Sequence, residues 1–262
     1  MNRIAIDLGF LKVYWYSITM FLGVLLGIVV AYIEIKRKKI DTSKFENMAF
    51  YAILFGFIGA RIYYCLFNLD YYLTNPLEIL MVWHGGLAIH GGIIGAVLAI
   101  YIYCQKKKLT CLEILDICTP ALVIGQVIGR WGNFFNSEAH GGIVTRSFLE
   151  SLHLPKFIID GMYINGNYYH PTFLYESFFN FLVFIILMIL RKNQKIRLGT
   201  ITGIYLMSYG VIRFFIESLR TDSLMIGAFK MAQIISIVLF IIGLILIILS
   251  KNKEKYNKEV IR

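Results

Sequence analysis

Seven apolar stretches, each long enough to cross a lipid bilayer as a helix, dominate this chain of 262 residues. The hydrocarbon core of a bilayer is about 30 Å thick, so a spanning helix needs about 20 apolar residues. The stretches are Tyr14–Ile33, Asn47–Phe67, Leu87–Cys104, Ile114–Asn133, Phe173–Leu190, Leu198–Leu219 and Met231–Ser250. Only 16% of the residues are charged, whereas soluble domains carry about 25%. The sequence therefore predicts an all-α polytopic membrane protein with seven transmembrane helices.

Lysine and arginine are divided unevenly between the loops on the two sides of these spans. Seventeen of the 26 Lys and Arg residues follow spans one, three, five and seven, and six lie on the other side. Because cytoplasmic loops carry the excess of basic residues, this pattern predicts an N-terminus outside, a C-terminus inside and a cytoplasmic basic tail at 251–262. The net charge of +10 is thus a signal of topology. No nucleic-acid partner is expected, since no basic face is interleaved with aromatic residues.

The longest loop, residues 134–172, connects spans four and five and predicts a small extracytoplasmic cap. Within it, residues 162–169 carry strand-forming residues on both sides of Asn165-Gly166, a pattern typical of a β-hairpin. We expect residues 1–262 to form a single transmembrane domain.

Three arginines lie within the predicted spans. At 1.5 Å per residue, Arg61, Arg130 and Arg213 lie about 21–24 Å from the cytoplasmic ends of their helices, in the outer half of the bilayer. Further polar residues fall near this depth: Tyr16, His90, Tyr175, Glu176 and Glu217. A charge in hydrocarbon is costly and usually functional, so this layer predicts a site near the outer leaflet. Asp116 lies near the cytoplasmic side and is predicted to be a helix N-terminal or interface carboxylate.

Two explanations of the arginines stay open. Arg213 and Glu217 are four residues apart, and Glu217 and Arg220 are three apart, so these side chains can form a structural ladder of ion pairs on one helix face. Arg130, in contrast, has no acidic residue three or four positions away. A guanidinium with unused donors matches the oxygens of a phosphate headgroup, which favours binding of an anionic lipid.

Two glycine-rich motifs flank this layer. Residues 84–92, HGGLAIHGG, place four glycines around two histidines, which allows either close helix packing or close approach of a substrate. Histidine is also suited to accept a proton near neutral pH. Residues 129–141, GRWGNFFNSEAHG, are too polar to face lipid and are expected to line a polar cavity. The chain has no HExxH motif or similar ligand spacing, so no metal site is expected.

Four motifs taken in order, HGGLAIHGG, GRWGNFFNSEAHG, HPTFLYE and YGVIRFFIESLR, resemble the bacterial prolipoprotein diacylglyceryl transferases. The resemblance covers essentially the whole chain and includes Trp15-Tyr16 and Arg61. Two positions depart from the family pattern: Phe173 stands where Gln is frequent, and Ile89 where an aromatic residue is common. We expect both departures to affect local packing and not the reaction class.

The resemblance implies a transferase of the bacterial cytoplasmic membrane that acts in protein lipidation, the first step of lipoprotein maturation. The family transfers the sn-1,2-diacylglyceryl group of phosphatidylglycerol to the lipobox cysteine thiol of a prolipoprotein signal peptide, and glycerol phosphate leaves. Phosphatidylglycerol, the signal peptide and the bilayer are therefore the expected partners, and no cofactor is expected. Both substrates would meet in the outer leaflet.

The resemblance also implies a set of site residues. Catalytic roles are expected for His90, Arg130, Glu138, Tyr209 and Arg213, and substrate-binding roles for Tyr16, Arg61, Arg130, Asn133, Gly141, Tyr175, Arg213 and Glu217. In our hypothesis, Arg130 and Arg213 bind the phosphate and Asn133 adds a donor. His90 is the candidate base for the thiol proton, supported by Glu217 or Glu138. A field of arginines could instead lower the thiol pKa unaided.

An anionic-lipid transporter or flippase is the alternative function, since it would also place arginines at one depth. Polar side chains that continue to the cytoplasmic side would favour it, and Asp116 is the residue that hints at this. The four cysteines show no CxxC pair and are expected to be small apolar fillers. None of them is proposed as a nucleophile, because the transfer needs no covalent enzyme intermediate.

Overall fold

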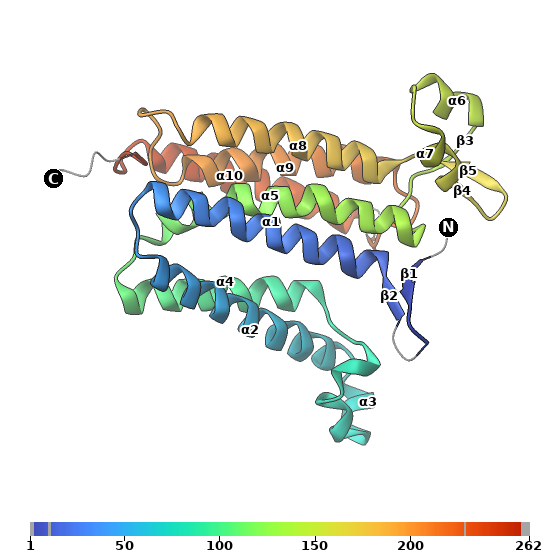
Figure 1. Ribbon diagram of the computed structural model, residues 1–262, viewed down its shortest axis with the longest axis horizontal. Coiled ribbons are helices and arrows are strands. Elements are labelled where there is room, and N and C mark those ends of the chain that lie inside the picture. The colour runs from blue at the N-terminus through green and yellow to red at the C-terminus, as the bar shows by residue number, and fades with distance from the viewer. Residues whose placement is uncertain (1–2, 10–11, 228, 258–262) are drawn as a thin grey trace. The chain divides into compact units, whose positions relative to one another are not determined.

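The computed structural model describes residues 3–9, 12–227 and 229–257 (Figure 1). The chain forms two compact units. The first unit combines Met1–Ala31 with Leu115–Arg262, and the second is Tyr32–Ile114. The end of the predicted basic tail, including Lys258 and Arg262, lies outside the described residues.

Each of the seven apolar stretches forms a helix of 19 residues or more. These helices are α1 (Trp15–Arg37), α2 (Thr42–Phe67), α4 (Ile89–Lys107), α5 (Cys111–Asn136), α8 (Thr172–Leu190), α9 (Thr200–Leu219) and α10 (Met231–Ser250). Among the described residues, five helices are long and apolar enough to cross a membrane, namely α1, α2, α5, α8 and α10. The count of seven spans and their orientation stay predictions.

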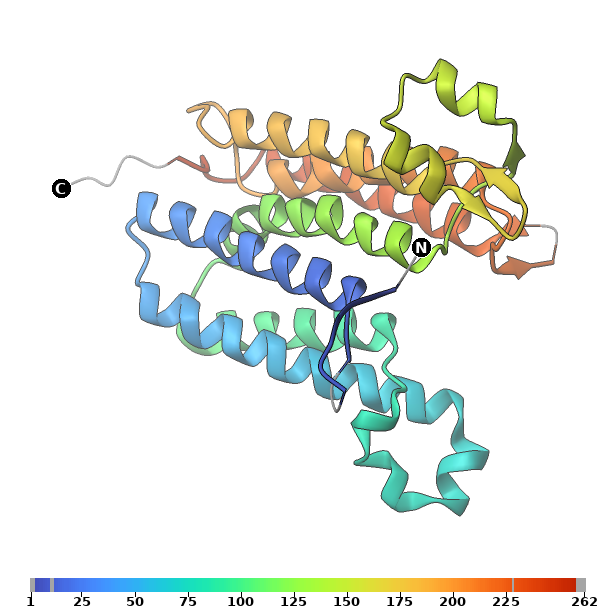
Figure 2. The same ribbon diagram turned by 45° about the vertical axis from the view of Figure 1, so that its right-hand side comes forward.

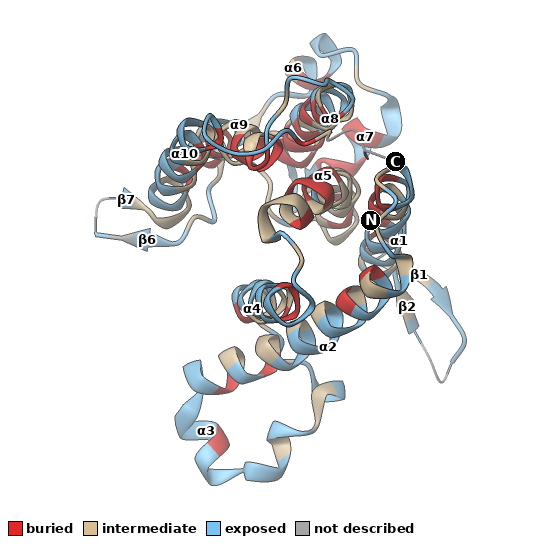
Figure 3. Cartoon of the chain, turned by 90° about the vertical axis from the view of Figure 1, so that its left-hand side faces the viewer, coloured by how far each residue is buried: buried red, intermediate tan, exposed pale blue. Residues whose placement is uncertain are grey.

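The long helices turn apolar side chains outward, as helices in lipid do. Figure 3 shows exposed residues along α2 and α10, and they include Phe50, Ile53, Ile241 and Ile245. An exposed apolar surface of this extent is incompatible with water and fits an integral membrane protein.

Glycines set the packing of α2 against α4 in the second unit. A Cβ atom on Gly91 would lie 2.2 Å from the carbonyl oxygen of Gly59, and one on Gly95 would lie 2.2 Å from that of Phe55. Only glycine allows two helix backbones to approach this closely. For Gly91 and Gly95, the structure thus provides the packing explanation of the glycine-rich sequence.

In the first unit, Asp116 of α5 caps the N-terminus of α9. Its carboxylate accepts hydrogen bonds from the backbone N–H of Gly199 at 2.6 Å and of Thr202 at 2.9 Å. Negative charge is favourable at a helix N-terminus, where backbone N–H groups lack partners. The prediction of a helix N-terminal carboxylate is confirmed, with the difference that the capped helix is not its own.

The cap follows the end of α5 and precedes α8 (Figure 2). It consists of β3 (Ile143–Val144), α6 (Arg146–Ser151), α7 (Lys156–Gly161), β4 (Tyr163–Ile164) and β5 (Asn167–Tyr169). The predicted hairpin is confirmed as the β4–β5 pair, and both turn residues, Asn165 and Gly166, have positive φ. The helices reach further than predicted, to Asn136 on one side and from Thr172 on the other. The core of the cap contains Phe134, Leu149, Ile159 and Phe173.

The fold is mostly helical, as expected, and short antiparallel ribbons accompany the helices. Besides the cap sheet, β1 (Ile4–Asp7) pairs with β2 (Lys12–Tyr14), and β6 (Met225–Ile226) pairs with β7 (Phe229–Lys230). Between α2 and α4 the chain forms three short turns of helix: α3 (Leu69–Thr74), η1 (Pro76–Ile79) and η2 (Val82–His84).

Candidate active site

The buried carboxylate of Glu176 joins two of the predicted site arginines in the first unit. Arg130 Nη2, from α5, lies 2.5 Å from Glu176 Oε1, and Arg213 Nη1, from α9, lies 3.2 Å from Glu176 Oε2. Glu176 is on α8, and only 2% of its side chain is exposed. Three helices distant in sequence therefore bring Arg130 and Arg213 to one carboxylate.

A second carboxylate, Glu217, extends this cluster along α9. Its Oε2 lies 2.6 Å from Arg213 Nη2 and 4.0 Å from Arg220 Nε. Arg220 in turn donates two hydrogen bonds of 2.9 Å to Asp222. The predicted pairing of Arg213, Glu217 and Arg220 is therefore confirmed, with the difference that Arg220 lies just beyond the end of α9. The arginine next to Asp222 holds the pKa of that carboxyl below its usual value.

A chain of polar contacts continues from Arg130 to the end of α5. Arg130 donates to the Asn133 side chain at 3.4 Å, and Asn133 Nδ2 donates to Glu138 Oε1 at 3.0 Å. Glu138 itself is exposed. The polar motif at residues 129–141 thus links the buried arginine to an exposed carboxylate.

Two tyrosines predicted for the site also belong to the first unit. Tyr209 interacts with Arg130 and lies in the electrostatic field of Glu176 and Arg213. Tyr16 packs on α5, where a Cβ atom on Gly132 would lie 2.8 Å from the Tyr16 ring.

Tyr175 lies beside His170, which precedes α8. The Tyr175 hydroxyl is 3.3 Å from His170 Nδ1, and the imidazole packs edge-on against Phe148 of the cap. Burial lowers the pKa of His170, because desolvation disfavours the charged form. Tyr175 therefore connects α8 to the cap.

Gly141 is buried where three segments meet. Its N–H donates to the carbonyl of His170 at 3.0 Å, and the N–H of Gly142 donates to Leu219 at 3.1 Å. A Cβ atom on Gly141 would lie 2.6 Å from the Cβ atom of His170 and 3.0 Å from the Leu219 carbonyl oxygen. This packing is sufficient to require glycine, and a contact of Gly141 with substrate stays a prediction.

Arg61 lies in the second unit, and its donors go to the backbone. Its guanidinium donates to the carbonyls of Ile79, Gly85 and Glu78 at 2.9, 2.6 and 2.5 Å, and also to Gly86 and Met81. A guanidinium has five N–H donors, and each of them has a carbonyl here. This geometry favours a role for Arg61 in holding the loop at 78–86, and the expected substrate-binding role of Arg61 stays a prediction.

His90 is also part of the second unit, in the first turn of α4. Its side chain is exposed, and its ring lies 6.0 Å from that of Tyr63. The preceding histidine, His84, lies 2.9 Å from Glu78 Oε2. His90 thus remains a candidate base, outside the cluster around Glu176.

Comparison with known proteins places the chain in a family. The model of the prolipoprotein diacylglyceryl transferase family matches residues 3–249. The chain belongs to this family. It is 48% identical to the phosphatidylglycerol–prolipoprotein diacylglyceryl transferase of Staphylococcus xylosus over 256 residues, 97% of this chain and 91% of that one. Identity to the proteins of the same name is 50% for Staphylococcus aureus (strain MSSA476), covering 98% and 91%, and 47% for Staphylococcus saprophyticus, covering 97% and 91%.

From the sequence, Glu176 was placed in the polar layer but was given no catalytic or substrate-binding role. The sequence did mark it, because a single carboxylate at the start of an apolar helix is not tolerated by lipid unless its charge is paired. Phe173, one of the two departures from the family pattern, stacks on Phe134 at 4.7 Å and contacts Trp131 at 5.4 Å. Phe173 is thus part of the apolar packing of the cap, and the expectation that this departure leaves the reaction class unchanged stays a prediction.

Proposed function

We propose that this protein transfers the diacylglyceryl group of phosphatidylglycerol to the lipobox cysteine of prolipoproteins and releases glycerol phosphate. Membership of the family and the activity for which its relatives are named support this transfer. The structural observation that carries the proposal is the convergence of Arg130 and Arg213 on Glu176.

The reaction forms a bond from sulfur to a glycerol carbon and breaks the bond from that carbon to a phosphate oxygen. The electron pair of the broken bond stays on the phosphate, so negative charge increases on the leaving group. Fixed cationic donors in a site of low dielectric constant stabilise such charge strongly. Arg130 and Arg213 are the proposed donors, and Asn133 is expected to add a further hydrogen bond.

Glu176 acts in this proposal as the residue that orients both guanidinium groups. A guanidinium donates five N–H groups in a fixed plane, so contacts with carboxylates leave other donors for phosphate. Because the carboxylate bridges the two side chains, their spacing is set before a lipid enters. Tyr209 and Glu138 border the same cluster through Arg130 and Asn133.

The nucleophile is the thiolate of the substrate cysteine, whose pKa in free thiols is about 8.5. Two ways of removing its proton remain: general-base catalysis by His90, or a lowered pKa in the field of Arg130 and Arg213. Replacing His90 by Gln is expected to leave phosphatidylglycerol binding intact and to reduce turnover. Unchanged turnover would exclude His90 as the base.

We further propose a plasma-membrane protein with seven spans, an external N-terminus and a site near the outer leaflet. The unequal distribution of lysine and arginine between the loops supports this orientation. Arg130 and Arg213 lie near the ends of α5 and α9, and Glu176 near the start of α8. All three are at the helix ends that adjoin the cap, which is the side predicted to be external.

Asp116 was the one residue that favoured the alternative of a lipid transporter, and it has a structural role. Asp116 caps α9 through two backbone N–H groups and the Thr202 hydroxyl. A carboxylate with this structural task is no evidence for a polar path toward the cytoplasmic side.

The deciding experiment uses purified protein, phosphatidylglycerol labelled in its inner glycerol and a lipobox peptide. We expect label on the cysteine peptide and none on a peptide with Ser in place of Cys. The Arg130→Ala variant is expected to abolish transfer. Absence of transfer by the unmodified protein, or near-normal transfer by the variant, would contradict the proposal.

A further inference from the structure

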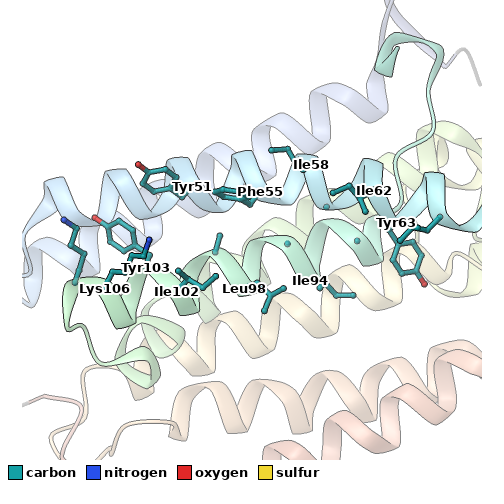
Figure 4. A pocket seen from close by; sticks show the side chains of 16 residues that line it. Tyr51, Phe55, Ile58, Ile62, Tyr63, Ile94, Leu98, Ile102, Tyr103 and Lys106 are labelled. Atoms are coloured by element: carbon teal, nitrogen blue, oxygen red, sulfur yellow. The ribbon is translucent and has the colours of Figure 1, made fainter. Parts of the chain in front are cut away.

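An apolar groove of about 800 Å³ runs between α2 and α4 within the second unit (Figure 4). Its walls carry Phe55 and Ile58 from α2 and Leu98 and Ile102 from α4. Along α4 the lining extends from Gly91 to Lys107, which corresponds to about 24 Å of helix. The groove is therefore long enough, and its lining apolar enough, to hold an extended hydrocarbon chain.

The groove results from the close packing of its two helices. Gly59, Gly91 and Gly95 line it, and these glycines bring the backbones of α2 and α4 into contact. These glycines carry no side chain, whereas large apolar side chains from both helices also line the groove. The groove thus follows the line along which α2 and α4 approach each other most closely at their glycines.

Charge is present at one end of the groove only. Lys106 and Lys107 line this end, and the rings of Tyr51 and Tyr103 lie beside them with their centroids 6.0 Å apart. The opposite end, at Tyr63 and Gly91, has no lysine or arginine among the lining residues. A ligand with one anionic end would therefore bind in one orientation, with that end at the lysines.

The two lysines differ from nearby cations that have internal partners. Lys38 Nζ lies 2.6 Å from Glu113 Oε1, and Arg37 donates to the buried Glu34. Within the described part of the chain, no ion pair or hydrogen bond involves the ammonium groups of Lys106 and Lys107. Their charges are thus available to an external anion.

We propose that this groove binds one anionic phospholipid, with an acyl chain between α2 and α4 and the phosphate on Lys106 and Lys107. Apolar walls that end in cations match an acyl chain that ends in a phosphate. None of the lining residues is among those expected to act in the transfer, so we propose this lipid in addition to the donor phosphatidylglycerol. By the positive-inside rule, the lysine end faces the cytoplasmic leaflet.

The test is photo-crosslinking with a lipid that lacks the glycerol headgroup of the proposed donor. The full-length protein is placed in phosphatidylcholine nanodiscs containing a little phosphatidylserine with a diazirine in one acyl chain. After irradiation, crosslinked peptides are mapped by mass spectrometry. We expect crosslinks in residues 51–66 and 91–107, displaced by unlabelled phosphatidylserine and not by phosphatidylcholine.

Two variants and two matched controls make the result specific. Replacing both Lys106 and Lys107 by Gln is expected to reduce crosslinking in the groove about tenfold or more. The same change at Lys192 and Lys195, which follow α8, removes equal charge and is expected to have no effect. Leu98→Trp is expected to fill the groove and abolish the crosslinks, whereas Ile237→Trp on the exposed face of α10 is expected to preserve them.

Several outcomes would overturn the proposal. They are equal crosslinking by a phosphatidylcholine probe, groove crosslinks that do not depend on the two lysines, and crosslinks spread over all helices. The readout does not involve transfer, so a failure here leaves the proposed function untouched, and a failure of the transfer assay leaves the lipid site untouched.

Discussion

The replacement Glu176→Gln tests whether this carboxylate orients the proposed phosphate-binding arginines. It keeps the shape of the side chain and removes the charge that Arg130 and Arg213 share at 2.5 and 3.2 Å. Breaking a buried ion pair by removing one partner costs about 3–5 kcal/mol. The amide oxygen of Gln still accepts one hydrogen bond. The side chains of Arg130 and Arg213 are 22% and 15% exposed, so solvent compensates part of the lost ion pairing. We therefore expect the replacement to cost about 2–3 kcal/mol of interaction free energy.

If this loss appears in the transition state, kcat/KM for diacylglyceryl transfer falls by about 30–150-fold. The assay is label transfer from phosphatidylglycerol to a lipobox peptide, with the folded fraction of each preparation measured by size-exclusion chromatography. Glu150→Gln is the control, because Glu150 and its partner Arg146 are both about half exposed and their pair contributes little. A folded Glu176→Gln variant with activity within about twofold of the unmodified protein would refute the reasoning.

Three further predictions concern the framework of the site. Gly141→Ala is expected to lower the free energy of unfolding by about 1–3 kcal/mol through overpacking. Gly142→Ala is the control and is expected to be tolerated, because a Cβ atom there meets nothing within 4 Å. Equal shifts of the melting temperature in the two variants would contradict this. Arg61→Lys is expected to speed amide hydrogen exchange at residues 78–88, since an ammonium has only three donors for several carbonyls, and unchanged exchange would exclude the loop-holding role. The pKa of His170 is lowered in the folded state, so the folded protein resists protonation of this side chain and loses stability as the pH falls below about 6.5. His170→Asn is expected to weaken this loss, measured as melting temperature against pH. An unaltered pH profile in the variant would argue against it.

The sequence was sufficient for those features that depend on local pattern. Apolar runs of about 20 residues predicted the seven long helices, because a backbone in lipid must satisfy its own hydrogen bonds. Asn165-Gly166 predicted the cap hairpin, since both turn positions need positive φ and these residues tolerate it. The spacing of Arg213, Glu217 and Arg220 predicted their pairing at the end of α9.

The features that depend on packing between distant segments were not accessible in this way. Arg130 has no acidic neighbour on α5, and its partner Glu176 lies 46 positions further along the chain, on α8. The contacts of Arg61 were not accessible for a related reason: its partners are backbone carbonyls, which every residue carries and no sequence pattern marks. The packing around Gly141, where three segments leave no space for a side chain, was likewise not visible in the sequence, and its expected role in substrate binding stays a prediction.

The two explanations of the arginines, a structural ladder and a phosphate site, are compatible in the observed geometry. Arg130, Arg213 and Arg220 are matched by Glu176, Glu217 and Asp222, so the cluster is neutral at rest. Paired charges can be accommodated in a medium of low dielectric constant, whereas unpaired guanidinium groups are costly there. The same pairing fixes the arginines before the reaction, and fixed donors stabilise a developing charge without the cost of reorganisation. In the proposed mechanism, the ladder therefore keeps cationic donors in place near lipid for an anionic leaving group.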